Sequence, residues 1–175
     1  GAAATPTDLP ALNNMLSRCQ RCPLHCGATQ AVFGEGPSDA KLMFIGEQPG
    51  DQEDLAGRPF IGPAGQLLTQ SLEASGLDRR DHYMTNAVKH FKFQARGKRR
   101  IHQTPTAGEI DMCSWWLDLE REIVKPRHIV TLGATALRAV LGPKAKLGDL
   151  RGQVLELADG TMLYPTIHPS YLLRL

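Results

Sequence analysis

Residues 41–47 read Lys-Leu-Met-Phe-Ile-Gly-Glu, and they carry the clearest indication of the fold class. The apolar run 42–45 is short and uninterrupted, with a lysine before it and a glycine after it. Such a run is typical of a strand that is buried on both faces, as in a parallel sheet. We therefore expect a sheet that helices cover on both sides.

On either side of this run, strand and helix patterns alternate. The expected strands are 42–45, 83–88, 128–132 and 163–167, with 153–157 as a candidate for a lesser edge strand. The expected helices are 8–19, 64–74, 106–125 and 133–141, and long loops are expected at 48–62 and 89–105. This alternation predicts a single α/β domain over residues 1–175, a three-layer α/β/α sandwich around a central, mainly parallel sheet of four strands.

The composition is that of an ordinary folded protein. Of the 175 residues, 42% are hydrophobic and 22% are charged, which argues against a disordered chain. No apolar run approaches the roughly 18 residues that a membrane-spanning helix needs. The first residues lack the basic start and apolar core of a signal peptide, so we expect a cytoplasmic protein without membrane contacts.

The basic residues are unevenly distributed along a chain whose formal net charge is only +2. Between Asp81 and Glu109 there is no acidic residue. The cations of this stretch are Lys89, Lys92, Arg96, Lys98, Arg99 and Arg100. A local basic run inside a nearly neutral chain indicates a surface for an anion, and nucleic acid is the first candidate.

The polar segments that follow the expected strands are 47–51, 86–102 and 168–170. In parallel sheets of this class, ligands bind outside the carboxyl ends of the strands. We therefore expect residues from these three segments to share one cleft, although they lie far apart in the sequence.

The cysteines indicate a metal centre. Cys19-x-x-Cys22 presents two thiols that can reach one metal centre, and in a reducing compartment such spacing favours metal over a disulfide. A third and a fourth ligand would come from among His25, Cys26, His90 and Cys113. The spacing alone does not distinguish zinc from an iron–sulfur cluster. It also leaves open the alternative that the two cysteines are free structural thiols.

The segment Gly46-Glu47-Gln48-Pro49-Gly50-Asp51 follows the first strand. Its glycines allow a ligand to approach the backbone closely, and Glu47 and Asp51 bring carboxylates to the expected cleft. Taken alone, these six residues fit a tight turn with solvated acids better. In the loop that follows, Phe60 is either a packing anchor or an aromatic ring that stacks on a base.

Three other polar positions have both a functional and a structural interpretation. The Asn86 amide offers a donor and an acceptor that match a pyrimidine edge with a carbonyl and an N–H, or it caps a turn. His102 ends the run Lys98-Arg99-Arg100-Ile101-His102. An imidazole can act as nucleophile, base or ligand, whereas the alternative interpretation of the run is a solvated set of cations. His168-Pro169-Ser170 is a phosphate-binding helix start or a capping turn.

Together and in this order, these motifs resemble the uracil-DNA glycosylase superfamily, and specifically its iron–sulfur branch. The segments that carry the resemblance are Cys19-x-x-Cys22-Pro23-Leu24, Gly46-Glu47-x-Pro49-Gly50, Gly57-Arg58-Pro59-Phe60, Thr85-Asn86-x-Val88-Lys89 and His168-Pro169-Ser170. The segments 46–51 and 98–102 are similar to the UdgX type, which cross-links itself to uracil-containing DNA.

The resemblance implies a uracil-DNA glycosylase-like fold, a [4Fe–4S] cluster and a DNA partner with uracil in a single strand or flipped out of a duplex. The implied cluster ligands are Cys19, Cys22, His90 and Cys113, with Cys26 as the alternative to His90. Members of the branch usually have cysteine where this chain has His90. The resemblance also implies a monomer in the bacterial cytosol or nucleoid.

The resemblance further implies roles in the reaction. Phe60 would stack on uracil, Asn86 would bond its edge, and Gln48, Asp51 and Arg100 would complete the substrate site. His168 would help to stabilise the leaving base. His102 would attack C1′ of the sugar with Glu47 orienting the ring, so that the protein reacts once. The alternatives are a glycosylase of the iron–sulfur type that turns over and a non-catalytic, metal-containing module that binds nucleic acid.

Overall fold

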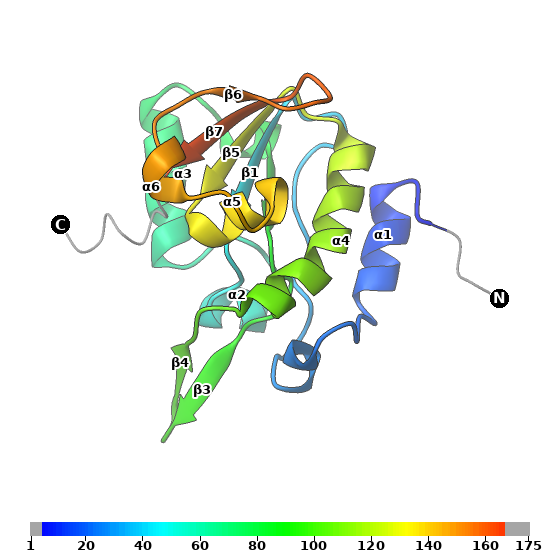
Figure 1. Ribbon diagram of the computed structural model, residues 1–175. Coiled ribbons are helices and arrows are strands. Elements are labelled where there is room, and N and C mark those ends of the chain that lie inside the picture. Colours follow the sequence, from blue (N-terminus) through cyan, green and yellow to red (C-terminus); the bar gives the residue numbers. More distant parts are fainter. Residues whose placement is uncertain (1–4, 167–175) are drawn as a thin grey trace.

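The structure is a computed structural model that describes residues 5–166. Its central sheet has five strands in the order β2-β1-β5-β7-β6 (Figure 1). These strands are β1 (Leu42–Gly46), β2 (Tyr83–Asn86), β5 (His128–Leu132), β6 (Leu155–Glu156) and β7 (Met162–Thr166). All neighbours pair in parallel except β6, which pairs antiparallel with β7. The predicted α/β class is confirmed, and the lesser edge strand raises the expected count of four strands to five.

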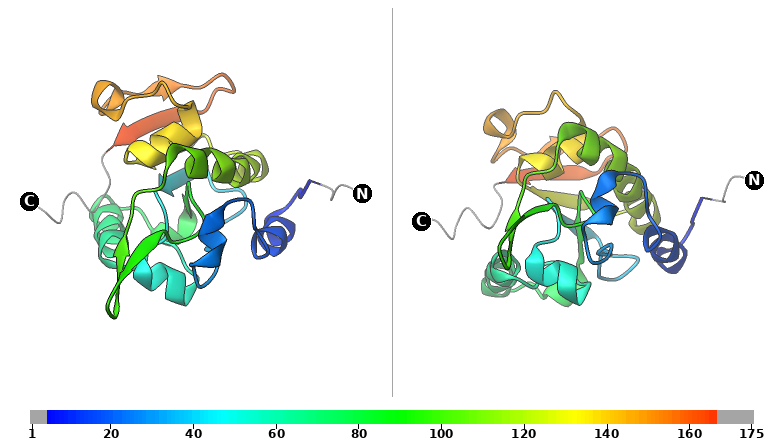
Figure 2. Two further views of the ribbon diagram at one scale, coloured as in Figure 1. Left: turned by 60° about the horizontal axis from the view of Figure 1, so that its bottom comes forward. Right: turned by 90° about the horizontal axis from the view of Figure 1, so that it is seen from below.

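Helices cover both faces of this sheet (Figures 1 and 2). The α-helices are α1 (Leu9–Leu16), α2 (Asp51–Ala56), α3 (Pro63–Ala74), α4 (Ala107–Val124), α5 (Ala134–Leu141) and α6 (Leu147–Leu150). Two short 3-10 helices, η1 (Pro23–Cys26) and η2 (Arg79–Asp81), lie in the connections. Helices α4 and α5 lie on one face, α1 packs on α4, and α3 lies on the opposite face. Within residues 5–166, no helix combines the length and apolar character that crossing a membrane requires.

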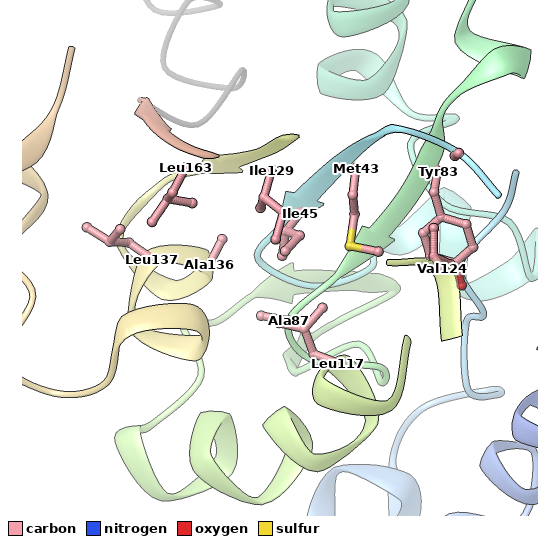
Figure 3. Close-up of a cluster of buried hydrophobic side chains, with 11 residues drawn as sticks. Met43, Ile45, Tyr83, Ala87, Leu117, Val124, Ile129, Ala136, Leu137 and Leu163 are labelled. Atoms are coloured by element: carbon pink, nitrogen blue, oxygen red, sulfur yellow. The ribbon is translucent and has the colours of Figure 1, made fainter. Parts of the chain in front are cut away.

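Alternate residues of each strand supply the two cores of this three-layer arrangement. One face of the sheet presents Met43, Ile45, Tyr83, Ile129 and Leu163, which meet Leu117 and Val124 of α4 and Ala136 and Leu137 of α5 (Figure 3). The other face presents Phe44, Met84 and Leu132, which meet Leu68 and Leu72 of α3. Burial on both faces explains why β1 reads as an unbroken apolar run.

Two of the expected loops contain regular structure that the sequence analysis missed. The segment 48–62 contains α2, whose single large apolar residue, Leu55, is 62% exposed, so no apolar stripe marks it as a helix. The segment 89–105 contains an antiparallel hairpin of β3 (Phe93–Arg96) and β4 (Arg99–His102), which turns at Gly97 with φ +59°. This hairpin projects from the body of the molecule (Figure 1).

A buried polar network joins α4 to the end of β2. Lys89, which the sequence analysis counted with the surface cations, is fully buried and forms an ion pair with the equally buried Glu120. Its Nζ also donates to Thr85 Oγ1 at 2.6 Å and to the backbone oxygen of Asn86 at 2.6 Å. Tyr83 donates its hydroxyl to Glu120 Oε2 at 2.5 Å. The lysine therefore stabilises the core and is not part of an anion-binding surface.

Replacing Tyr83 with phenylalanine should flatten the loss of stability at alkaline pH. Burial, with the neighbouring Glu120 charge, raises the pKa of Tyr83 above its ordinary value of about 10, so the folded protein keeps a proton that the unfolded chain loses. Above about pH 10 this group lowers the wild-type free energy of unfolding by about 1.4 kcal/mol per pH unit. Urea unfolding of wild type and Tyr83→Phe on both sides of that pH measures the difference. Equal slopes would contradict this role.

Candidate active site

A pocket of about 490 Å³ opens at the carboxyl ends of the parallel strands. Its lining includes Glu47, Gln48, Asp51, Phe60, Asn86 and His102. The expected convergence of the segments 47–51 and 86–102 is confirmed, and the third segment, 168–170, lies outside the described residues. A larger cavity of about 940 Å³, between the end of α4 and the start of β5, contains none of the candidate site residues.

His102 and Glu47 meet at the mouth of this pocket, although they lie 55 residues apart in the chain. His102 Nε2 lies 2.7 Å from Glu47 Oε1, and Thr135 Oγ1 donates to the other carboxylate oxygen at 3.1 Å. Glu47 follows β1, whereas Thr135 lies in the first turn of α5, after β5. Strands β1 and β5 are the neighbours between which the chain order of the sheet reverses, and this is where ligands bind in such folds.

Phe60 and Asn86 converge over Gly46. A Cβ atom at Gly46 would lie 2.6 Å from Asn86 Oδ1 and 2.7 Å from Phe60 Cζ, so only glycine leaves room for both side chains. Both residues are largely buried, with 8% of Phe60 and 5% of Asn86 exposed. The pocket therefore combines an aromatic ring with a planar amide at one end of β1.

Gln48 has a role that the sequence analysis did not assign to it. Its side-chain amide donates to the backbone oxygen of Gln103 at 2.7 Å, and its Oε1 accepts the N–H of Lys92 at 2.7 Å. These residues lie just outside the two strands of the β3–β4 hairpin. Gln48 thus fixes the base of the hairpin that carries His102.

Arg100 and Asp51, both predicted to bind substrate, contact each other. Arg100 Nε donates to Asp51 Oδ1 at 2.6 Å, and its Nη1 donates to Asp54 Oδ2 at 2.6 Å. The guanidinium also lies 5.1 Å from the ring centroids of Phe91 and Phe93. These contacts tie the hairpin to α2, and the substrate-binding roles of Arg100 and Asp51 stay predictions. The exposed cations of the hairpin are Arg96, Lys98 and Arg99.

Asp54, a further residue beside the site that was not predicted from the sequence, is fully buried beneath Arg100. Besides this cation, its carboxylate accepts the N–H of Thr29 at 2.9 Å. Asp54 lies inside the segment that was expected to be a loop, and no motif marks it. A helix-start carboxylate of this kind becomes recognisable only when α2 is known.

The four predicted metal ligands are all buried, with exposed fractions of 8% for Cys19, 5% for Cys22, 4% for His90 and 1% for Cys113. A hydrogen bond with Cys113 lowers the pKa of Cys22 to about 6, and the backbone N–H of Leu24 acts in the same direction. The Cys22 thiol therefore ionises more readily than an ordinary cysteine, and the thiolate is the form that binds metals.

The donor set fits an iron–sulfur cluster. The buried His90 Nδ1 has no hydrogen-bond partner among the described residues, and Trp116 donates its indole N–H to Cys19 Sγ at 3.1 Å. Within residues 5–166, no three His, Cys, Asp or Glu residues gather tightly enough to hold a single metal ion. An iron–sulfur cluster does not require such a tight group, because each of its irons binds a different side chain of the protein. Cys26 is exposed, which makes it the weaker alternative to His90.

Comparison with known proteins points to one superfamily. Residues 33–175 match the family described as "Uracil DNA glycosylase superfamily". The chain is 42% identical to a type-4 uracil-DNA glycosylase of Thermotoga maritima, over 93% of this chain and 82% of the relative. It is 39% identical to a type-4 uracil-DNA glycosylase of Pyrobaculum aerophilum (95% and 85%) and 32% identical to a type-5 uracil-DNA glycosylase of that organism (90% and 80%).

Replacing Arg100 with methionine should loosen the hairpin and destabilise the fold by about 1.5–3 kcal/mol, the usual contribution of hydrogen bonds to charged groups. The reason is that the buried Asp54 carboxylate loses the cation that pairs with it. Urea unfolding measures the loss, and amide hydrogen exchange shows whether it is concentrated in β3 and β4. The exposed neighbour Arg99, replaced in the same way, is the matched control. Equal effects of the two substitutions would contradict the anchoring role.

Proposed function

Because the chain belongs to the uracil-DNA glycosylase superfamily, we propose that it excises uracil from DNA in DNA repair. The family match and the type-4 relatives support the activity. The pocket supports it independently, because its lining includes an aromatic ring and a planar amide, the kinds of group that stack on a flipped base and bond its edge. The observation that carries the finer proposal below is the contact between His102 and Glu47 at the mouth of that pocket.

Recognition of the base follows from the chemistry of Phe60 and Asn86. Uracil inside a duplex is inaccessible, so the base must be flipped out or offered on a single strand. The Phe60 ring stacks on its face, and the Asn86 amide bonds the O4 and N3–H edge. Cytosine has donor and acceptor exchanged at these two positions, so it mismatches the same amide. The exposed cations of the hairpin contact the DNA phosphates.

Cleavage requires stabilisation of the charges that develop as the C1′–N1 bond lengthens. The sugar gains oxocarbenium character, as in glycoside hydrolysis, and uracil leaves with the bonding electron pair. In our proposal the backbone N–H groups near Gln48, together with His168, stabilise the anionic base. One such donor typically contributes about 2.7–4 kcal/mol to lowering a barrier.

We further propose that His102 captures C1′, as the resemblance to the UdgX type implies. The lone pair of a ring nitrogen forms the new bond to C1′ as the bond to uracil breaks, and the ring proton passes to the Glu47 carboxylate. A carboxylate bonded to one imidazole nitrogen orients the ring and raises the basicity of the other nitrogen. The product is an N-glycosidic bond to histidine without a good leaving group, so the reaction stops after one turnover.

The second candidate is a glycosylase that turns over, and the identity to the type-4 relatives favours it. In that reaction Glu47 positions a water molecule, which takes the place of the imidazole as the nucleophile. A third candidate, a metal-containing module that only binds nucleic acid, has no need for the paired imidazole and carboxylate at the pocket mouth.

We also propose that Cys19, Cys22, His90 and Cys113 hold a [4Fe–4S] cluster. The burial of all four side chains and the Nδ1 of His90, which has no hydrogen-bond partner within residues 5–166, support this ligand set. The cluster would order the segments that carry its ligands, and the excision step balances without any redox change. A histidine ligand would raise the cluster potential relative to four cysteines, by analogy with centres in which His replaces Cys.

The wild-type protein should form a boiling-resistant adduct with a uracil-containing oligonucleotide, seen as a shifted band on a denaturing gel. His102→Ala should abolish this band while leaving uracil-DNA binding largely intact, because Phe60 and Asn86 remain. His102→Ser should admit water and release free uracil repeatedly. A thymine oligonucleotide and His128→Ala, at the opposite end of the sheet, are the controls.

Each alternative to the proposed reaction predicts a different outcome of this experiment. Release of many uracils per wild-type protein without a shifted band would establish the turnover glycosylase. Binding without any change in the DNA would establish the binding module. A band that persists in His102→Ala would show that another residue is the nucleophile.

Protein purified without oxygen should be brown and contain about four irons and four sulfides per chain. His90→Ala should lower the iron content or make the cluster labile to oxygen, because it removes one ligand. Cys26→Ala is the matched control and should keep the full iron content. If Cys26→Ala loses iron and His90→Ala does not, the fourth ligand is Cys26.

A further inference from the structure

The backbone of Phe60 adopts an unusual conformation. Its φ angle is +54°, in the left-handed region that residues with a side chain rarely occupy. Such a conformation persists only when the surrounding structure enforces it, and it is often found at ligand sites. What holds Phe60 therefore bears directly on where its ring lies.

Arg79, from η2, forms hydrogen bonds with this backbone. Its guanidinium donates to the backbone oxygens of Pro59 and Phe60 and to Thr69 Oγ1, the last at 3.2 Å. Only 17% of the Arg79 side chain is exposed. A planar guanidinium can bond two neighbouring carbonyl oxygens at once, which the point charge of a lysine cannot do equally well.

Two further contacts hold the same backbone segment, one from Glu53 and one from Gly65. Glu53 accepts the backbone N–H of Ile61 at 3.1 Å and that of Gly62. A Cβ atom at Gly65 would overlap the Phe60 carbonyl group, so α3 lies directly against this backbone. The carbonyl oxygens of 59–60 are thus held by a cation, and the N–H groups of 61–62 by a carboxylate.

We propose that Arg79 is a positioning residue, which fixes the Phe60 ring over Gly46 before substrate arrives. Arg79 is absent from the described lining of the pocket and lies 19 residues from Phe60 in the chain. It therefore acts through Phe60. Without the guanidinium, residues 59–62 relax toward ordinary backbone angles, and the ring no longer stays in the pocket. The consequence for uracil recognition rests on the proposed function.

The first experiment uses the protein without DNA. In Arg79→Met, amide hydrogen exchange at residues 60–62 should accelerate by about tenfold or more, whereas the strands of the central sheet keep their protection. Arg80→Met is the matched control, because Arg80 is 88% exposed and bonds only the neighbouring Asp78 among the described contacts. Arg79→Lys, which keeps the charge, should fall between wild type and Arg79→Met and serves if Arg79→Met folds poorly.

The second experiment is a double-mutant cycle on the reaction with uracil-containing DNA. Arg79→Met should raise the DNA concentration for half-maximal rate by about tenfold and change the saturated rate less, because ring stacking supports binding. In a Phe60→Ala background the same substitution should add nothing. Arg80→Met should leave both parameters unchanged.

The two experiments separate this inference from the proposed function. Unchanged exchange at residues 60–62 in Arg79→Met, or additive effects of the Arg79 and Phe60 substitutions, would overturn the positioning role. A wild-type protein that leaves uracil-containing DNA intact would overturn the proposed function, while hydrogen exchange would still decide whether Arg79 holds Phe60.

Discussion

The geometry of the site depends most on the interactions of the buried Glu120 carboxylate. It neutralises Lys89 in the core, and Lys89 in turn holds the backbone oxygen of Asn86. Breaking a buried ion pair by removing one partner typically costs about 3–5 kcal/mol, because the other charge stays buried. The same lysine precedes His90 in the chain. One short segment, 86–90, therefore joins the pocket-lining amide of Asn86, the core of the domain and a candidate cluster ligand.

Much of the fold could be predicted from local patterns in the sequence. The apolar run of β1 marks a doubly covered strand, and the capping box of Thr106 and Glu109 starts α4 as expected. The patterns fail where an element buries little apolar surface. Helix α2 turns Leu55 to solvent, and the β3–β4 hairpin is polar on most positions, so neither shows the period of its secondary structure.

The candidate site divides in a similar way. Residues at strand ends, such as Glu47 and Asn86, could be predicted because parallel strands present their carboxyl ends at one edge. The supporting residues could not, because their role depends on distant partners. No motif in the sequence includes Arg79, and Arg100 was predicted to bind substrate, yet both guanidinium groups bond oxygen atoms of the protein itself. Charge in a sequence does not reveal whether it faces water or the protein.

The register of the β3–β4 hairpin has a consequence for how such a protein can diversify. His102 pairs with Phe93 at the base of the hairpin, whereas the cations lie at its exposed tip. If the proposed function holds, insertions or charge changes at the tip would alter the reach and strength of DNA contact without moving the imidazole, since Gln48 fastens the base and Arg100 ties β4 to α2. In the proposed function, affinity for the nucleic acid and reactivity toward the sugar would thus be independently adjustable in evolution or by design.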